Sequence, residues 1–264
     1  MMADAARPEA QTDPPSRVTY LGHASVLVEL DGVRLLTDPL LRERIGHLRR
    51  HSRAVEVAHR GGIDGVLISH LHHDHFDLPS LRLLGRDMPI VVPQGAAGVL
   101  RRDGFRVVQE LGVGERLQVG AVEVEATPAL HSGHRPPFGP TADCLGFVVA
   151  GSRRLYFAGD TDLFPGMADL GAGLDLALLP VWGWGPTLGP GHLDPLRAAS
   201  ALTLLRPRLA VPIHWGTFWP IGLARAGPRY LAEPPLLFAR HAARLAPEVQ
   251  VRVVQPGEPL GLEP

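Results

Sequence analysis

Short apolar runs recur along the chain and alternate with polar segments, a pattern that predicts many strands with interspersed helices. The chain opens on three predicted strands at 18–21, 25–30 and 33–37. The last two are joined at Asp31-Gly32, a dipeptide that favours a tight hairpin turn. The following segment, 40–60, is rich in arginine and poorly periodic, so we interpret it as a long loop or a loop with a short helix.

Strands and helices then alternate, as they do in α/β folds. Further strands are predicted at 65–69, 90–92, 105–108, 116–119, 121–126, 144–150, 153–158, 174–179, 209–212 and 249–254. Helices are predicted at 78–84, 96–102, near Met167, at 195–205 and within 231–245, the last interrupted early by Pro234-Pro235. Two β-rich halves, each closed by helices, predict an α/β protein with helix–sheet–sheet–helix (αββα) layers.

Length and composition indicate one folded domain. The chain has 264 residues, 45% of them hydrophobic, which is near the size at which single cores begin to split. Residues 1–17 are rich in Ala, Pro, Asp and Glu and lack the apolar core of a signal peptide. We therefore expect a disordered tail at 1–17 and a single domain at 18–264.

The net charge and the cysteine content limit which partners and which cellular compartment the sequence predicts. Arginine and lysine number 26, aspartate and glutamate 27, so the formal net charge of -1 predicts no nucleic-acid partner. No run reaches the roughly 20 apolar residues of a membrane span. Cys144 is the only cysteine, which excludes an internal disulfide and favours the cytoplasm. The oligomeric state has no signature in the sequence.

The most informative segment places four potential metal ligands in six residues. His70, His72, Asp74 and His75 follow a short apolar run and precede a predicted helix, so they lie on a loop. In extended backbone, residues two apart point the same way, which lets His70 and His72 reach one point. A turn at His73 could then aim Asp74 and His75 at a second point. The spacing predicts two metal ions.

Four other apolar runs also end in a potential ligand. Their terminal ligands are His131, Asp160, His192 and, after the strand at 209–212, His214. Open α/β sheets bind ligands outside the carboxyl ends of their strands. One sheet edge could therefore gather all of these residues.

The ordered series of ligands resembles the metallo-β-lactamase superfamily, whose fold is an αββα sandwich with a dinuclear metal site at one edge. Five further motifs are similar to the branch that contains ascorbate-6-phosphate lactonase and the N-acyl-phosphatidylethanolamine-hydrolysing phospholipase D. These motifs are Leu21-Gly22-His23-Ala24-Ser25, Leu36-Thr37-Asp38-Pro39, Ala158-Gly159-Asp160-Thr161, Gly191-His192-Leu193-Asp194-Pro195 and Ile213-His214-Trp215-Gly216-Thr217-Phe218.

The resemblance implies a complete set of seven metal ligands. One metal site would comprise His70, His72 and His131, a second Asp74, His75 and His214, with Asp160 bridging both. His134 is a neighbouring competitor for the position of His131. Imidazole and carboxylate ligands favour zinc, with manganese or iron as alternatives.

The resemblance implies a hydrolase in which a metal-bridging hydroxide attacks a small-molecule substrate at a phosphodiester or a lactone or other ester bond. Asp74 would orient the hydroxide or move its proton. Flavodiiron relatives carry a carboxylate where His72 stands, which favours hydrolysis over redox chemistry. A non-catalytic metal-binding module of the same fold and an iron-dependent oxygenase are the alternatives.

For the remaining candidate residues, the sequence allows two interpretations each. His192 could contact the substrate or donate a proton, or its motif could merely cap the helix at 195–205. His23 and Asp38 could orient metal ligands or only end strands. The arginines could meet an anion or form a solvated face, and the aromatic residues could line an apolar pocket or fill the core. These two sets are Arg42, Arg44, Arg49, Arg50 and Arg53, and Trp182, Trp184, Phe218 and Trp219.

Overall fold

A computed structural model describes residues 16–185, 187–223 and 228–263 of the protein. The expected N-terminal tail therefore lies outside the described residues except for its last two positions. Arg17 already belongs to the first strand, and its guanidinium pairs with Glu29 on the neighbouring strand.

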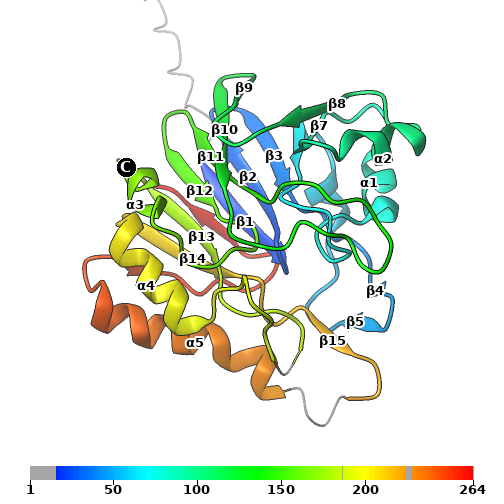
Figure 1. The fold of residues 1–264 in the computed structure, drawn as a ribbon. Helices are drawn as coiled ribbons and strands as arrows, with labels where there is room; N and C mark the ends of the chain where they lie inside the picture. Colours follow the sequence, from blue (N-terminus) through cyan, green and yellow to red (C-terminus); the bar gives the residue numbers. More distant parts are fainter. Residues whose placement is uncertain (1–15, 186, 224–227, 264) are drawn as a thin grey trace, which may run out of the picture.

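Two seven-stranded sheets form the centre of the molecule (Figure 1). The first contains, in spatial order, β17 (Pro259–Gly261), β1 (Arg17–Gly22), β2 (Ser25–Leu30), β3 (Val33–Thr37), β6 (Gly65–Leu67), β7 (Ile90–Pro93) and β8 (Val108–Leu111). The second contains β16 (Gln250–Val251), β14 (Leu209–Ile213), β13 (Leu176–Pro180), β12 (Arg154–Phe157), β11 (Leu145–Ala150), β10 (Val122–Pro128) and β9 (Arg116–Val119).

Helices cover the outer face of each sheet, which confirms the predicted αββα layers (Figure 1). The first sheet is covered by α1 (Leu78–Leu84) and α2 (Ala97–Arg102), and the second by α3 (Met167–Leu170), α4 (Pro195–Leu205) and α5 (Pro228–Leu245). Side chains alternate along the strands. Val26 and Val28 of β2 join the core between the sheets, whereas Leu27 packs with α1 and α2.

Local sequence explains where two of these helices begin. The Asp77 carboxylate accepts the Ser80 amide at the start of α1, and the Asp194 carboxylate accepts the Arg197 amide at the start of α4. Each capping aspartate thus satisfies an amide that the helix leaves free, and a proline sits in the first turn of both helices.

A small third sheet lies beside the carboxyl ends of the central strands. It is built from β4 (Arg44–Ile45), β5 (Leu48–Arg50) and β15 (Phe218–Pro220), with β5 between the other two. The side chain of Arg50, the last residue of β5, is buried and donates to the carbonyls of Leu21, Leu40 and Arg42. This guanidinium joins the arginine-rich segment to the end of β1. The short helix expected as one option occurs at Val57–Arg60 and is a 3-10 helix.

Several predictions of secondary structure differ from the fold. Of the strand expected at 249–254, only Gln250–Val251 forms β16. The strand expected at 105–108 begins only at Val108, because Gly104 has a φ of 91° and turns Phe105 into the core beneath α2. The helix within 231–245 continues through Pro234-Pro235, since its buried residues Phe238 and Ala242 anchor it in the core. The four short strands β4, β5, β15 and β17 were not predicted.

Among the described residues, no helix combines the length and the apolar character needed to cross a bilayer.

Gly159 brings the loop after β12 into close contact with the loop after β6. Its φ is 61°, and a Cβ at this position would lie 2.8 Å from both the Leu145 carbonyl oxygen and the Ser69 Cβ. The absence of a side chain therefore sets how near Asp160 comes to the residues that follow Ser69.

We predict that Gly159→Ala is more destabilising than Gly173→Ala, a matched control with a φ of 69° and no atom within 4 Å of an added Cβ. The left-handed conformation alone costs about 1–2 kcal/mol at each position. The contacts at Gly159 should add about 1–3 kcal/mol. Urea denaturation would measure both values, and equal losses would contradict the close contact.

Candidate metal centre

The carboxyl ends of four central strands deliver the candidate ligands to one edge of the two sheets. The loop after β6 carries His70, His72, Asp74 and His75, while the segments after β10, β12 and β14 carry His131, Asp160 and His214. The structure brings all seven predicted residues together. They are surrounded by the segments that follow β3 and β13, which supply Asp38 and Trp182.

His70, His72 and His131 form one group in which one ligand atom of each lies within 4.8 Å of the others. The Nδ1 of His72 lies 3.1 Å from the Nε2 of His131. The Nε2 of His70 is buried and has no hydrogen-bond partner among the described residues. His134, the competitor, is exposed and contributes only its backbone carbonyl, which accepts from His72 at 3.0 Å.

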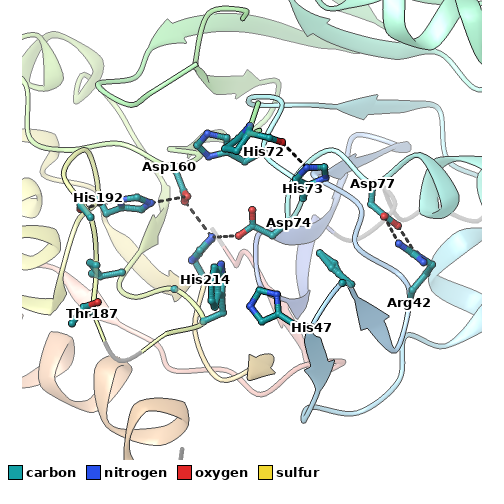
Figure 2. Close-up of a pocket in the computed structure, with 17 residues that line it drawn as sticks. Arg42, His47, His72, His73, Asp74, Asp77, Asp160, Thr187, His192 and His214 are labelled. Atoms are coloured by element: carbon teal, nitrogen blue, oxygen red, sulfur yellow. Dashed lines mark hydrogen bonds and ion pairs between the residues drawn. The ribbon is translucent and has the colours of Figure 1, made fainter. Parts of the chain in front are cut away.

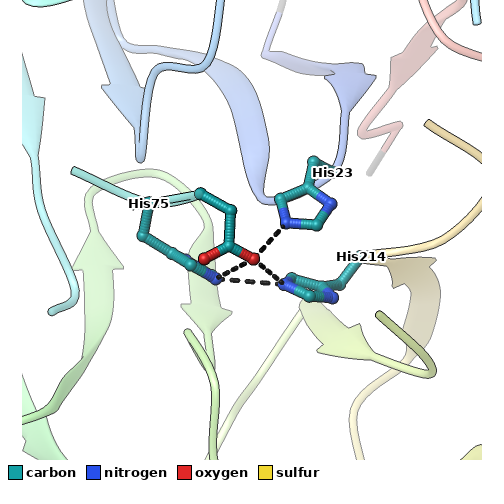
Figure 3. Close-up of side chains that lie close together, drawn as sticks. His23, His75 and His214 are labelled. Atoms are coloured by element: carbon teal, nitrogen blue, oxygen red, sulfur yellow. Dashed lines mark hydrogen bonds and ion pairs between the residues drawn. The ribbon is translucent and has the colours of Figure 1, made fainter. Parts of the chain in front are cut away.

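A second group contains Asp74, His75, His214 and His23, whose ligand atoms also lie within 4.8 Å of one another. Figure 3 shows the three imidazoles converging on one carboxylate. The Nε2 atoms of His75 and His214 are 3.0 Å apart. His23 lies 2.8 Å from Asp74, and its ring is tilted by 38° against that of His214, with ring centroids 3.8 Å apart.

Asp160 lies between the two groups. Its carboxylate oxygens are 3.2 Å from the Nε2 of His75, 3.4 Å from that of His214 and 3.6 Å from that of His192. It is also within 4.8 Å of His131 and His192, measured between ligand atoms. One buried oxygen, Oδ1, makes no hydrogen bond to a described residue.

Each candidate imidazole uses one nitrogen to bond away from the centre. Nδ1–H of His131 donates to the Gly191 carbonyl at 2.8 Å, and Nδ1–H of His214 to the Trp182 carbonyl at 2.7 Å. Nε2–H of His72 donates to the carbonyl of His134. These bonds fix the tautomer, so the lone pair of the other nitrogen faces the centre.

Asp38 and Ser69 fix the orientations of His75 and His70 in the same way, through hydrogen bonds. The Asp38 carboxylate accepts from His75 Nδ1 at 2.7 Å, from the Ser69 hydroxyl at 2.6 Å and from the Ser69 amide at 2.7 Å. Because the Ser69 hydroxyl donates to Asp38, its oxygen can accept from Nδ1 of His70 at 3.0 Å. Asp38 therefore lies behind the ligands and orients two of them.

Burial determines the protonation of most of the imidazoles. It lowers the pKa of His214 to about 3 and also lowers the pKa values of His70, His72 and His131. These four histidines are neutral near pH 7, as metal ligands must be.

His75 and the carboxylates behave differently. Burial alone would lower the pKa of His75, but Asp160, Asp74 and Asp38 together hold it well above its usual value. Burial would raise the pKa values of Asp74 and Asp160, yet the neighbouring imidazoles hold both well below the ordinary range. The metal-free centre therefore carries a protonated His75 among ionised carboxylates.

A pocket of about 560 Å³ opens over these residues (Figure 2). Asp74, Asp160, His192 and His214 point toward one another at its floor. His192 has a side chain 24% exposed and packs edge-on against His131. It faces the pocket instead of the helix, whose cap is supplied by Asp194.

The five arginines between residues 42 and 53 lie in three environments, which are the pocket, the core and the surface. Arg42 lines the pocket but is paired with Asp77, and Arg50 of β5 is buried. The other three arginines are exposed. Of the aromatic set, Trp184 lines the pocket, whereas Phe218 and Trp219 are buried.

Arg135 and His73 make a connection that the sequence did not reveal. Arg135 donates to the carbonyls of Leu71 and Phe76 and to Nδ1 of His73, while Nε2–H of His73 donates to the Pro136 carbonyl. These bonds hold the loop after β10 against the ligand loop. Only the proximity of Arg135 to His131 in the sequence could have indicated this role.

Comparison with known proteins shows to which family the chain belongs. A model of the family described as "Beta-lactamase superfamily domain" matches residues 33–215. An uncharacterized protein of Mycobacterium tuberculosis is 34% identical over 260 residues, which cover 91% of this chain and 67% of the relative. A protein of Rubrobacter xylanophilus named UPF0173 metal-dependent hydrolase is 34% identical over 257 residues, covering 93% of this chain and 96% of the relative.

A solved structure shows the same fold. Igni18, described as a novel metallo hydrolase from the hyperthermophilic archaeon Ignicoccus hospitalis, is similar with a TM-score of 0.72 and 26% sequence identity. The match covers 95% of this chain and 99% of that chain.

We predict that loading the metal-free protein with zinc near pH 7 releases about one proton per chain, because His75 must lose the proton on Nε2 before it can bind. Since the pKa of His75 is raised, zinc affinity should fall as the pH decreases. Titration calorimetry in two buffers of different ionisation enthalpy would count the protons. Asp38→Asn removes one of the charges that raise this pKa and should reduce the release. Identical heats in both buffers would contradict the prediction.

Proposed function

The chain belongs to the metallo-β-lactamase superfamily, and from this membership and the geometry of the centre we propose that it is a dinuclear-metal-dependent hydrolase. The proposal depends on one observation. Seven buried or half-buried side chains direct candidate ligand atoms at a common region, while hydrogen bonds on the far side of the imidazoles hold them in place. Such a set is costly to bury without a cation, because its carboxylates and nitrogens would remain without partners.

The residues fit a pair of divalent ions. His70, His72 and His131 would hold one ion, and Asp74, His75 and His214 the other, with Asp160 shared between them. The unpartnered Nε2 of His70 and Oδ1 of Asp160 are the atoms that most need such a partner. A donor set of five imidazoles and two carboxylates favours zinc, with manganese or iron as alternatives.

When bound, divalent ions would lower the pKa of a coordinated water to about 7 and so would supply hydroxide at neutral pH. The chain's own residues orient this chemistry. Asp74 is held by the buried His23 at 2.8 Å and remains ionised, so it can accept a hydrogen bond that orients the attacking group at the floor of the pocket. His192 faces the same space from the Asp160 side, where it can contact an anionic oxygen of the substrate or donate a proton to the leaving group.

We further propose a small-molecule substrate with a phosphodiester or a lactone or other ester bond, which a pocket of about 560 Å³ accommodates. The motifs that contain His23, Asp160 and His214 support placement in the branch of ascorbate-6-phosphate lactonase and the phospholipase D named above. The free, buried Cys144 fits a reducing compartment such as the cytoplasm.

Metal content and hydrolysis, measured together, test the proposal. The parent protein should bind about two metal ions per chain and hydrolyse bis(p-nitrophenyl) phosphate or members of a lactone panel. Asp74→Ala and His214→Ala should lower the metal content and reduce kcat/KM by more than about 100-fold, a larger loss than orienting residues cause. His51→Ala replaces an exposed histidine outside the pocket and should change neither quantity.

Two results would overturn the proposal. Bound metal without turnover of any ester would indicate a metal-binding module. A single iron per chain with oxygen uptake would indicate an oxygenase.

A further inference from the structure

We infer that the pocket has a subsite for an uncharged, apolar arm of the substrate, formed by Ile45, Trp184 and Leu188 with His47 at its edge. The inference deepens the proposed function and rests on it, since the arm is defined relative to the metal centre. The subsite lies on the wall formed by the β4–β5 hairpin and the segment after β13, and His47 occupies the hairpin turn (Figure 2).

Trp184 is held in place by the core beneath it. Its ring packs against the buried cluster formed by Leu40, Ile45, Leu48 and Phe218, yet the residue is only partly buried and lines the pocket. The imidazole of His47 meets it edge-on, with ring centroids 5.4 Å apart and planes at 77°. One side of the indole is thus fixed by the protein while the pocket remains open to a ligand. An aromatic ring of a ligand would be attracted to an indole held in this way.

The turn that carries Trp184 is also fixed. Trp182 Nε1–H donates to the Gly185 carbonyl at 2.9 Å, which closes the segment around Trp184. The Trp182 ring stacks on Tyr230 of α5, which stacks in turn on Trp219 of β15. A rigid wall of this kind loses little conformational entropy when a ligand binds.

The subsite begins beside the metal centre. A Cβ built on Gly183 would lie 3.2 Å from Leu188 Cδ2 and 3.9 Å from His214 Cε1, so this glycine separates the apolar wall from a candidate ligand. Because Gly183 has no side chain, a substrate bound at the metals can extend directly toward Leu188 and Trp184.

Charge on the pocket wall favours an uncharged arm. Apart from Asp74 and Asp160 at the centre, Arg42 and Asp77 are the lining residues with formal charges among those described. Arg42 binds Asp77 through two nitrogens at 2.8 and 2.6 Å, so the pair has no net charge. A second anionic group on the substrate would have to compete with Asp77. The wall therefore favours substrates whose arm is a ring or branched alkyl group over substrates that carry a second anionic group.

Titration calorimetry with two hydroxamates would test the subsite in the zinc-loaded protein. Acetohydroxamate and phenylacetohydroxamate share the metal-binding head and differ only in the arm. The phenyl compound should bind at least about tenfold more tightly, which is ~1.4 kcal/mol. Trp184→Ala should remove most of this ratio while leaving acetohydroxamate affinity unchanged.

Two further variants make the result decisive. Leu188→Ala should also reduce the ratio, and it serves if Trp184→Ala fails to fold, since Trp184 also contacts the core. Leu83→Ala shortens a leucine that is 54% exposed on α1 and should leave the ratio unchanged. A ratio near one in the parent protein, or one that both pocket variants leave intact, would overturn the subsite.

An anionic arm provides the opposite test. The monohydroxamate of succinate should bind no more tightly than acetohydroxamate, and tighter binding would overturn the uncharged arm in favour of an anion near Arg42. Hydrolysis of p-nitrophenyl acetate and p-nitrophenyl phenylacetate, run in parallel, separates the two proposals. Turnover without arm preference contradicts only the subsite, whereas arm-dependent binding without any turnover contradicts only the proposed hydrolase. If neither hydroxamate binds, the metal centre and the subsite both fail.

Discussion

The metal centre depends on the hydrogen bond that each imidazole makes on the side facing away from the centre. An isolated histidine can present either nitrogen, and a cluster of them would turn their N–H groups toward any nearby carboxylate. Here the outward nitrogens of His131 and His214 donate to backbone carbonyls, and that of His75 donates to Asp38. These bonds leave the inward nitrogens of His131 and His214 only as acceptors, and the inward nitrogen of His75 becomes one when it loses its proton. This is the electronic arrangement that a cation requires.

The fold satisfies this requirement by bringing two distant motifs together. The Thr217 hydroxyl lies 2.6 Å from the His23 amide, the His214 amide donates to the His23 carbonyl, and the Phe218 ring meets the His23 ring edge-on. His23 and His214 both have positive φ values, of 57° and 62°, which aim their side chains away from the directions of their strands. Strain at these two positions is offset by the hydrogen bonds between the motifs.

The sequence predicted the layers, most strands and the gathering of the candidate ligand residues at one edge, because these features have local signatures. Apolar runs mark the strands, and a ligand at the end of a run can be recognised without its partners. The anchoring carbonyls of Gly191 and Trp182 could not be predicted, since every residue has a carbonyl and only the folded chain shows which one faces an imidazole. The strands β5 and β15 were missed for a similar reason. They are short, and their pairing joins residues such as Arg50 and Phe218 that are far apart in the chain.

The pairing of β15 with β5 also limits how the substrate specificity of this protein can evolve. β15 begins four residues after His214, and the strand bonded to it leads into the hairpin turn that carries His47. The wall that would receive the organic part of a substrate is therefore continuous, through a few backbone hydrogen bonds, with the segment that supplies a candidate ligand. Remodelling this wall to admit a different compound would also move that imidazole. Selectivity for substrates and affinity for the cation cannot evolve independently on this side, so new specificities should arise more readily from the opposite rim, around Pro136.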